Sequence, residues 1–408
     1  MLHAAPVPLG NGACMKIDAF SQVSERIDVC IPGYTFEIMR SGECIAGIRF
    51  IFVNSIHRRK HDTFHQCGNT MKNPDIVSTI PLGFTWDTVD PFLFCVHHAD
   101  AYPRGNRHLG PDVSLEGRTL GNDFQLKDGW RMYHGEHVPG FPSHPHRGFE
   151  TVTVVLQGFV DHSDSHGAAG RYGNGDVQWM TAGSGLQHCE MFPLLNREAG
   201  NPLELFQIWL NLPQAKKMVA PHFKMLWGES IPTYSARDEA GKRSDVTIIA
   251  GRLGNLHAPD PAPDSYAADA GNELAIWIIS IEAGGRCIMP AASHAAKRRL
   301  YFFEGDAARV NGYDIPSYHA VDLPGNVESI IESGGSDIRL LLLQGKPINE
   351  PVVQYGPFVM NTRKEIEKAF EDYRATQFGG WPWDTPDHVH PHDAGRFARY
   401  SDGRIEKP

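Results

Sequence analysis

Two short stretches of this 408-residue chain carry side chains whose types and spacing suit metal chemistry. The first contains His144, His146 and Glu150, and the second, about forty residues further on, contains His188 and Glu190. Two imidazoles and a carboxylate that leave other positions open describe a non-haem iron site. Because the second stretch adds a His-x-Glu pair, we interpret the combination as a metal centre and not as isolated core or surface histidines.

The elements around these residues must bring them to one face. Residues 151–156 form a β-branched run that is typical of a strand. Alternate residues of a strand share a face, so His144, His146 and Glu150 point the same way if the strand is regular through Pro145 and Gly148. The same parity aligns His188 with Glu190.

Composition limits the class of protein. The chain is 41% hydrophobic and 21% charged with a net charge of −10, as in ordinary globular proteins, and this acidity argues against direct nucleic-acid binding. No apolar run is long enough for a membrane span, and no secretory signal opens the sequence. The seven cysteines form no CxxC pair, which favours reduced thiols in a cytoplasmic protein, or a nuclear one in a eukaryote.

The spacing of turn residues along the chain is that of an all-β protein. Short apolar runs separated by Gly and Pro turns favour a sandwich or small barrel over a βαβ sheet. A passage around 162–165 reads as turn-rich, and the region 273–343 repeats the architecture of the first half. The expected strands are 91–96, 151–156, 177–180, 204–210, 273–280, 300–304 and 338–343.

The two ends of the chain differ from this pattern. Residues 1–75 are expected to be a loosely attached extension before an overall more regular chain. Thr362 and Glu365 have the spacing of a capping box and open one helix, which Gly379 and Gly380 end. The His- and Trp-rich tail, 381–408, is expected to be a loose terminus, with an adventitious metal site as the alternative.

Four segments of the chain resemble a known protein family. The segments that carry the resemblance to the pirin family of the cupin superfamily are 144–152, 175–191, 206–213 and 355–362. They are specific, and the resemblance extends over about residues 75–380. It implies two cupin-type β-barrel (jelly-roll-like) domains in one chain, with a short C-terminal helix and a single metal in the first domain.

The composition of the chain and this resemblance together suggest domain limits. These are an N-terminal extension at 1–75, a metal-binding cupin at 76–255, a linker or long loop at 256–272, a second cupin with the helix at 273–380, and a tail at 381–408. The second cupin has no His-x-His or His-x-Glu, and His294 stands alone there, so its expected role is structural.

By the same resemblance, the pirin ligands fall on His144, His146, His188 and Glu190. An ordinary cupin would instead use Glu150, four places after the second histidine. We therefore expect Glu150 to be an outer carboxylate that orients a ligand, with a structural salt bridge to a base such as Arg147 as the alternative. Fe(II) is the expected metal, although Mn, Co, Ni, Cu or Zn would also bind such ligands. Cys189, between two ligands, is expected to be a buried inert thiol.

Two functions follow from the resemblance. The first is a metal-dependent dioxygenase that opens a flavonol such as quercetin and releases CO, with Glu190 or Glu150 as general base. Its partners would be O2 and a small aromatic, flavonol-like substrate. The alternative is a non-catalytic, iron-binding and redox-sensitive transcriptional co-regulator that acts through a protein partner. A cupin enzyme acting on a different phenolic metabolite is a third reading, because fold and motif do not fix substrate.

Overall fold

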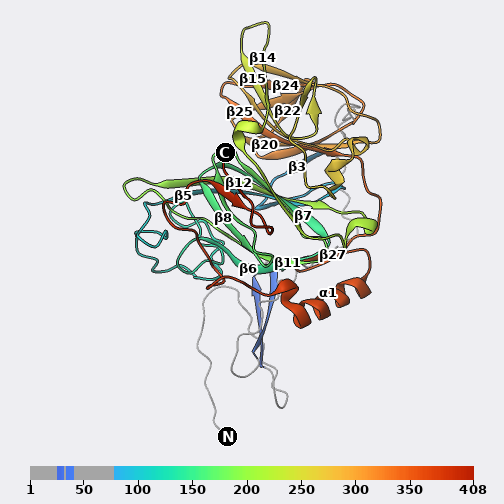
Figure 1. Cartoon of the computed structure of the whole chain (residues 1–408). Helices are drawn as coiled ribbons and strands as arrows, with labels where there is room; N and C mark the ends of the chain where they lie inside the picture. The colour runs from blue at the N-terminus through green and yellow to red at the C-terminus, as the bar shows by residue number, and fades with distance from the viewer. Residues whose placement is uncertain (1–24, 32–33, 41–77) are drawn as a thin grey trace, which may run out of the picture. The chain divides into compact units, whose positions relative to one another are not determined.

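The computed structural model describes residues 25–31, 34–40 and 78–408. The first two segments are strands β1 (Glu25–Ile31) and β2 (Tyr34–Arg40), which pair as an antiparallel hairpin (Figure 1). This hairpin belongs to a different compact unit from the sheets of the two cupins and is described by itself. Apart from the hairpin, the expected extension over 1–75 lies outside the described residues.

The first cupin consists of two six-stranded sheets. One sheet has the strand order β13-β10-β7-β12-β5-β4 and the other has the order β29-β28-β9-β8-β11-β6. The strands of the first are β4 (Thr85–Trp86), β5 (Phe92–Tyr102), β7 (Phe149–Gln157), β10 (Val177–Thr181), β12 (Asn201–Asn211) and β13 (His222–Leu226). Those of the second are β6 (Gly140–His146), β8 (Phe159–Asp164), β9 (Ala169–Gly173), β11 (Leu186–Met191), β28 (Phe397–Arg399) and β29 (Ile405–Glu406).

The second cupin pairs a seven-stranded sheet, β14-β15-β18-β25-β20-β23-β3, with a four-stranded sheet, β19-β24-β21-β22. The larger sheet contains β3 (Ser78–Pro81), β14 (Thr233–Arg237), β15 (Arg243–Ala250), β18 (Ala275–Ile281), β20 (Lys297–Glu304), β23 (His319–Leu323) and β25 (Ile338–Gly345). The smaller contains β19 (Arg286–Met289), β21 (Ala308–Val310), β22 (Tyr313–Ile315) and β24 (Ser329–Ser333). The remaining short strands are β16 (Arg252–Leu253), β17 (Leu256–His257), β26 (Val353–Tyr355) and β27 (Phe358–Met360).

The predicted all-β fold and its repeated architecture are confirmed. The order β10-β7-β12-β5 in the first cupin recurs as β23-β20-β25-β18 in the second. Each of the seven predicted strands lies on an observed strand, with at most two of its residues beyond the end of that strand. The passage at 162–165, predicted as a turn, instead lies mostly on β8. Its residues are buried, so this polar sequence belongs to a strand and not to a surface turn. The domain boundaries proposed from the sequence stay predictions.

Apolar side chains form a core inside each cupin and a third core between them. Strand β7 shows how one strand serves two of them, because all but its last two residues are buried. Val152 and Val154 pack in the core between the two large sheets, with Ile276 and Leu341 of the second cupin. Val155 packs inside the first cupin. Burying a Val side chain stabilises the fold by about 1.5–3 kcal/mol, so this strand ties the two cupins together.

The predicted capping box opens helix α1 (Arg363–Thr376), where Glu365 N donates to Thr362 Oγ1 and Thr362 N donates to Glu365 Oε2. Ile366 and Ala369 are buried on its inner face. Short 3-10 helices complete the structure, at Gln214–Lys216, Gly228–Ser230, Tyr266–Ala268, Ala270–Asn272 and Gln377–Gly379. Within the described part of the chain, helices of the length and apolarity that a bilayer crossing demands are lacking.

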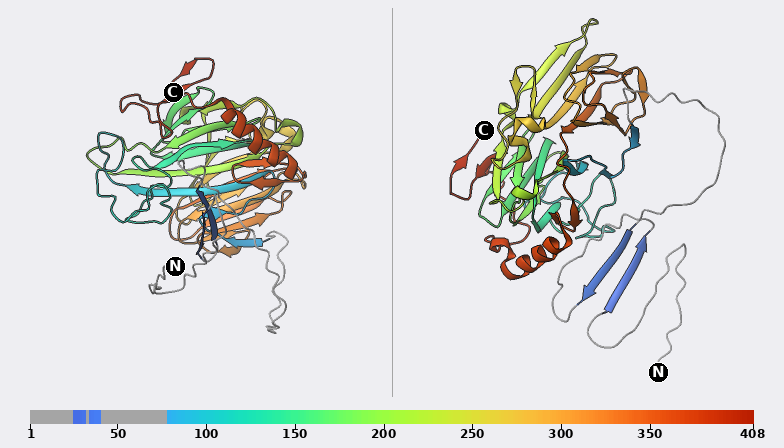
Figure 2. Two further views of the ribbon diagram at one scale, coloured as in Figure 1. Left: turned by 90° about the horizontal axis from the view of Figure 1, so that it is seen from below. Right: turned by 90° about the vertical axis from the view of Figure 1, so that its right-hand side faces the viewer.

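The expectation of a loose C-terminal tail is wrong. The red segment after α1 returns to the green strands of the first cupin (Figure 2). There β28 pairs with β9. Arg171 on β9, fully buried, forms a two-pronged ion pair with Asp161 and also donates to the carbonyl oxygens of His390 and Pro391. A buried arginine that needs several acceptors holds a segment that local composition would leave free.

Gly148 separates β6 from β7 and sends the two strands into different sheets. Its φ is +85°, a left-handed value that L side chains rarely adopt. A Cβ at this position would lie 2.0 Å from the carbonyl oxygen of Val359. The chain therefore turns here only because the residue is glycine.

We predict that Gly148→Ala lowers the free energy of unfolding by about 2–4 kcal/mol, from backbone strain and from the clash with Val359. Gly167→Ala is the matched control, because φ there is +82° but nothing lies within 4 Å of the added Cβ. The control should cost only the strain, about 1 kcal/mol. Urea denaturation of both variants measures the difference, and equal losses would show that the contact with Val359 is unimportant.

Candidate metal centre

Three imidazoles meet on two neighbouring strands. His144 and His146 lie on β6, and His188 lies on β11 directly opposite His144 in the antiparallel register. The ring centroids of these histidines are 4.5–4.9 Å apart. One nitrogen from each lies within 4.8 Å of the other two. The structure therefore brings together the three histidines that the sequence singled out, in an arrangement that could hold one cation.

Burial favours the neutral form of His144 and His188, which is the form that binds a metal. Desolvation lowers the pKa of His144 to about 4, and together with the neighbouring histidines it lowers the pKa of His188 well below the ordinary value. His144 Nδ1 lies 2.8 Å from the carbonyl oxygen of Pro142, which can only accept a hydrogen bond. Nδ1 therefore carries the proton, and Nε2 has the free lone pair that a metal needs.

His188 provides the test of whether a metal fits. Its ring is fully buried, and neither ring nitrogen has a hydrogen-bond partner. Leaving one buried polar group unpaired costs about 1–3 kcal/mol, so native proteins rarely leave both nitrogens of a ring unpaired. Coordination of a cation by one nitrogen would remove most of this cost. The residues present therefore fit a divalent metal.

Glu190, the expected fourth ligand, lies beside the three histidines. Its Oε2 is 3.8 Å from His188 Nε2 and accepts a hydrogen bond of 2.8 Å from Gln207 Nε2. Its Oε1 lies 3.0 Å from the hydroxyl of Thr153, which also lies 2.5 Å from Gln207 Oε1. Burial raises the pKa of Glu190. Two neutral side chains thus fix the orientation of the carboxylate without neutralising its charge.

Sequence reasoning did not assign a role to Thr153 or Gln207, or to His162, whose ring centroid lies 5.4 Å from that of His188. Thr153 and Gln207 are opposite each other in the pairing of β7 with β12, and His162 is opposite Glu190 in the pairing of β8 with β11. These contacts arise from strand register, which spans up to 54 residues here. The one usable signal was a polar residue at an inward position of an apolar strand.

The expectation that Glu150 shares a face with the histidines is wrong. Gly148 breaks the strand, and on β7 it is Phe149 that packs against His146, with ring centroids 5.1 Å apart. Strand alternation then directs Glu150 to the opposite face. Its carboxylate accepts hydrogen bonds from Trp179, Thr181 and Ser265, at 3.1, 2.7 and 2.6 Å.

The alternative reading of Glu150, an ion pair with Arg147, does not hold either. Arg147 donates instead to Asp372 on α1, at 2.8 Å, and to the carbonyl oxygen of Ser184, at 2.7 Å. Its guanidinium also lies 4.5 Å from the ring centroid of Phe378. Arg147 therefore ties the end of the histidine strand to the C-terminal helix.

The tail supports the outer side of the ligand-bearing sheet. Ser143 N on β6 donates to the carbonyl oxygen of Pro386, and Trp383 Nε1 donates to that of Asp164 on β8. The thiol of Cys189 on β11 lies 3.6 Å from the carbonyl oxygen of His388. Burial raises the pKa of this thiol, which agrees with the inert cysteine that was expected.

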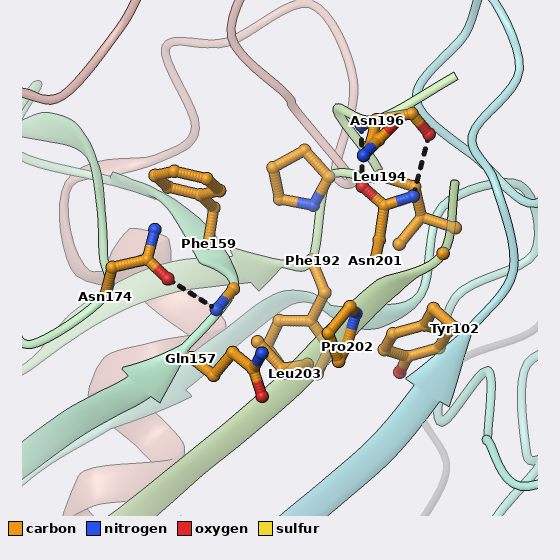
Figure 3. Close-up of a pocket in the computed structure, with 13 residues that line it drawn as sticks. Tyr102, Gln157, Phe159, Asn174, Phe192, Leu194, Asn196, Asn201, Pro202 and Leu203 are labelled. Carbon is orange, nitrogen blue, oxygen red and sulfur yellow. Dashed lines mark hydrogen bonds between the residues drawn. The ribbon is translucent and has the colours of Figure 1, made fainter. Parts of the chain in front are cut away.

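Aromatic side chains surround the histidines on the inner side. Trp209, which is partly exposed, lies 5.4 Å from His146 and 4.3 Å from Phe149 between ring centroids. Phe141, also partly exposed, lies 6.4 Å from His144. These rings pack against the histidines on that side. A separate pocket of about 190 Å³, lined by residues such as Tyr102, is shown in Figure 3, and none of its lining residues is a candidate ligand.

We predict that His188→Ala lowers affinity for Fe(II) or Co(II) by at least about a hundredfold, since even outer partners of metal ligands contribute ten- to a hundredfold. Titration calorimetry under anaerobic conditions measures the affinity. His166→Ala, an exposed histidine near the end of β8, is the control and should bind metal normally. Unchanged affinity in the His188 variant would exclude this site.

Glu150 gives a pH-dependent prediction. Burial raises its pKa from 4.5 to about 7, in spite of three side-chain hydrogen bonds that oppose the shift. The folded state then binds more protons than the unfolded state between these values, so its stability falls as pH rises from 4.5 through 7. The full difference is about 3 kcal/mol.

Urea denaturation from pH 5 to 8 should show this decline as a difference between the wild type and Glu150→Gln, in which the titrating group is absent. Other titrating groups cancel in the difference. Glu116→Gln, at an exposed glutamate, is the control substitution. A difference that does not vary with pH would mean that Glu150 titrates normally in the folded protein.

Comparison with known proteins agrees with this geometry. The sequence profile described as Pirin matches residues 85–210, and the one described as Pirin C-terminal cupin domain matches residues 276–379. A protein of Pseudomonas aeruginosa named "Putative quercetin 2,3-dioxygenase" is 39% identical over 242 residues, which cover 59% of this chain and 79% of that protein. A pirin-like protein of Solanum lycopersicum is 37% identical over 244 residues, covering 59% and 77%.

Among solved structures, a quercetin 2,3-dioxygenase from Acinetobacter baumannii superposes with a TM-score of 0.58 and 27% identity. The match covers 75% of this chain and 98% of that one. Two matching profiles, relatives that align over most of their length and the shared double-cupin fold lead to one conclusion. The chain belongs to the pirin family, with two cupin domains.

Proposed function

We propose that this protein is a metal-dependent dioxygenase that opens the central ring of a flavonol such as quercetin. In this reaction the flavonol takes up O2, and the products are a ring-opened ester and CO. The observation that carries the proposal is the cluster of three imidazoles beside a fixed carboxylate and aromatic side chains. The quercetin dioxygenase names of the relatives support the choice of substrate class.

His144, His146, His188 and Glu190 would hold the metal, and Fe(II) is the ion that we propose. When bound, it supplies a Lewis acid that lowers the pKa of a substrate hydroxyl, and redox chemistry toward O2. Three nitrogens and one carboxylate leave open positions in an octahedral shell.

The chain's own residues position the substrate and handle its proton. Trp209 and Phe141, both partly exposed, are placed to contact a flat aromatic ring system that approaches the histidines. The buried surroundings exclude water from the reacting centre. The Glu190 carboxylate, held by Gln207 and Thr153, is the group that we expect to accept the hydroxyl proton of the flavonol.

The test is quercetin turnover with direct detection of CO, using the full chain reconstituted anaerobically with Fe(II) and then exposed to O2. We expect turnover in the wild type and none above background in the His144→Ala, His146→Ala double variant. Gln207→Leu should retain the three histidines but lose the donor to Glu190, and we expect a ten- to a hundredfold loss of metal affinity or activity.

Trp209→Leu distinguishes substrate positioning from chemistry, because it leaves all four candidate ligands in place. It should raise KM for quercetin more than it lowers kcat, since it removes an aromatic contact and no reacting group. Stoichiometric metal binding without quercetin turnover, with iron and with the other divalent metals, would contradict the flavonol assignment.

A further inference from the structure

The second cupin contains a buried arginine whose charge no carboxylate in the described chain neutralises. Arg298, at the start of β20, is 2% exposed. Its Nη1 donates to the carbonyl oxygen of Val327 at 3.0 Å, but its Nε and Nη2 are buried without a partner. Burial alone lowers the pKa of the guanidinium to about 10. Native structures rarely leave a buried charge in this state.

The two unpaired groups of Arg298 form one edge of the guanidinium. This is the edge that other arginines of this chain present to carboxylates. Arg171 uses Nε and Nη2 to bind both oxygens of Asp161, at 2.7 Å each. Arg299, next in sequence, binds both oxygens of Asp322 in the same way, at 2.5 and 2.8 Å. The matching edge of Arg298 thus has the geometry of a carboxylate receptor.

Strand register places Arg298 at one end of the interior of the second cupin. It lies opposite Leu323 on β23, on the same face of β20 as Leu300 and Phe302, which belong to the internal core. Ser329, at the start of β24, shares the face of Ile331 in that same core. The Ser329 side chain is fully buried, and its hydroxyl also lacks a partner. Arg298 donates to the carbonyl oxygen of Val327, which lies two residues before Ser329 in the sequence. The unpaired groups of Arg298 and Ser329 therefore lie near the same end of the domain.

This end corresponds to the metal end of the first cupin. The two cupins share strand order, so β20 occupies the place of β7, and the pair β19–β24 occupies the place of the ligand-bearing pair β6–β11. Loops at 290–296 and 324–328 flank this end, and both contain exposed residues.

We propose that the second cupin binds a small carboxylate at this end, with Arg298 as the two-pronged receptor and Ser329 as an additional donor. The planar, two-oxygen shape of a carboxylate matches the free edge of the guanidinium better than a tetrahedral anion or a halide does. The proposal is independent of the flavonol reaction, because it concerns residues of the other domain.

The test is a titration of the full chain with acetate, and in parallel with phosphate, in a chloride background at constant ionic strength. Thermal unfolding and titration calorimetry report binding. The His144→Ala, His146→Ala background, free of metal, prevents acetate from binding at the metal centre. We expect saturable stabilisation by acetate and a weaker effect of phosphate.

Variants separate charge from geometry. Arg298→Met should weaken acetate binding at least about tenfold, and Arg298→Lys should also weaken it, because lysine keeps the charge and loses the paired donors. Ser329→Ala should weaken binding a few-fold and is the milder change if the arginine variants fail to fold. Arg299→Lys is the matched control and should bind acetate like its parent, because its carboxylate partner is Asp322.

Three results would overturn the proposal. The first is absence of saturable acetate binding in the parent protein. The second is acetate binding that persists undiminished in Arg298→Lys and Ser329→Ala. The third is tighter binding of phosphate than of acetate with the same dependence on Arg298, which would replace the carboxylate with a tetrahedral anion as the ligand class.

Discussion

Crowding of three imidazoles on two neighbouring strands is the constraint on which the first cupin depends. Neighbouring rings and burial together oppose protonation, so His144 and His188 must stay neutral, and their nitrogens have few partners. Such a group is destabilising by itself. It persists because both ligand-bearing strands are held on their outer side by hydrogen bonds from the tail and from the end of α1, including that from Gln187 to Gln377 at 2.7 Å. These hydrogen bonds offset the free-energy cost of crowding the imidazoles.

The two cupins show how one scaffold can carry different chemistry. Their central strands have the same order, yet one end holds histidines and a carboxylate, and the corresponding end holds Arg298 and Ser329. Each set contains buried polar groups without hydrogen-bond partners. Function in such folds belongs to the site and not to the fold, so the second domain need not copy the metal centre to have a site of its own.

The sequence was sufficient for features that depend on local pattern. Strand periodicity, the capping box at Thr362 and the histidine spacing all act within a few residues, and the structure agrees with them. The prediction that Glu150 shares a face with the histidines was wrong because side chains alternate only along a continuous strand, and Gly148 interrupts this one. The roles of Thr153 and Gln207, and the docking of the tail on Arg171, arise from pairings between distant segments, which local periodicity does not encode.

These distant pairings make the first cupin dependent on the C-terminal helix and tail. Arg147, beside the histidine strand, binds Asp372 on α1, and Ser143 binds the carbonyl oxygen of Pro386. A fragment that ended before the second cupin would lack both partners and would leave the apolar face of β7, with Val152 and Val154, uncovered. An exposed apolar face favours association with other chains. The candidate metal centre thus lies in the first cupin but depends on contacts from helix α1, the tail and the second cupin. This gives a physical reason for keeping the second cupin in the same chain as the first.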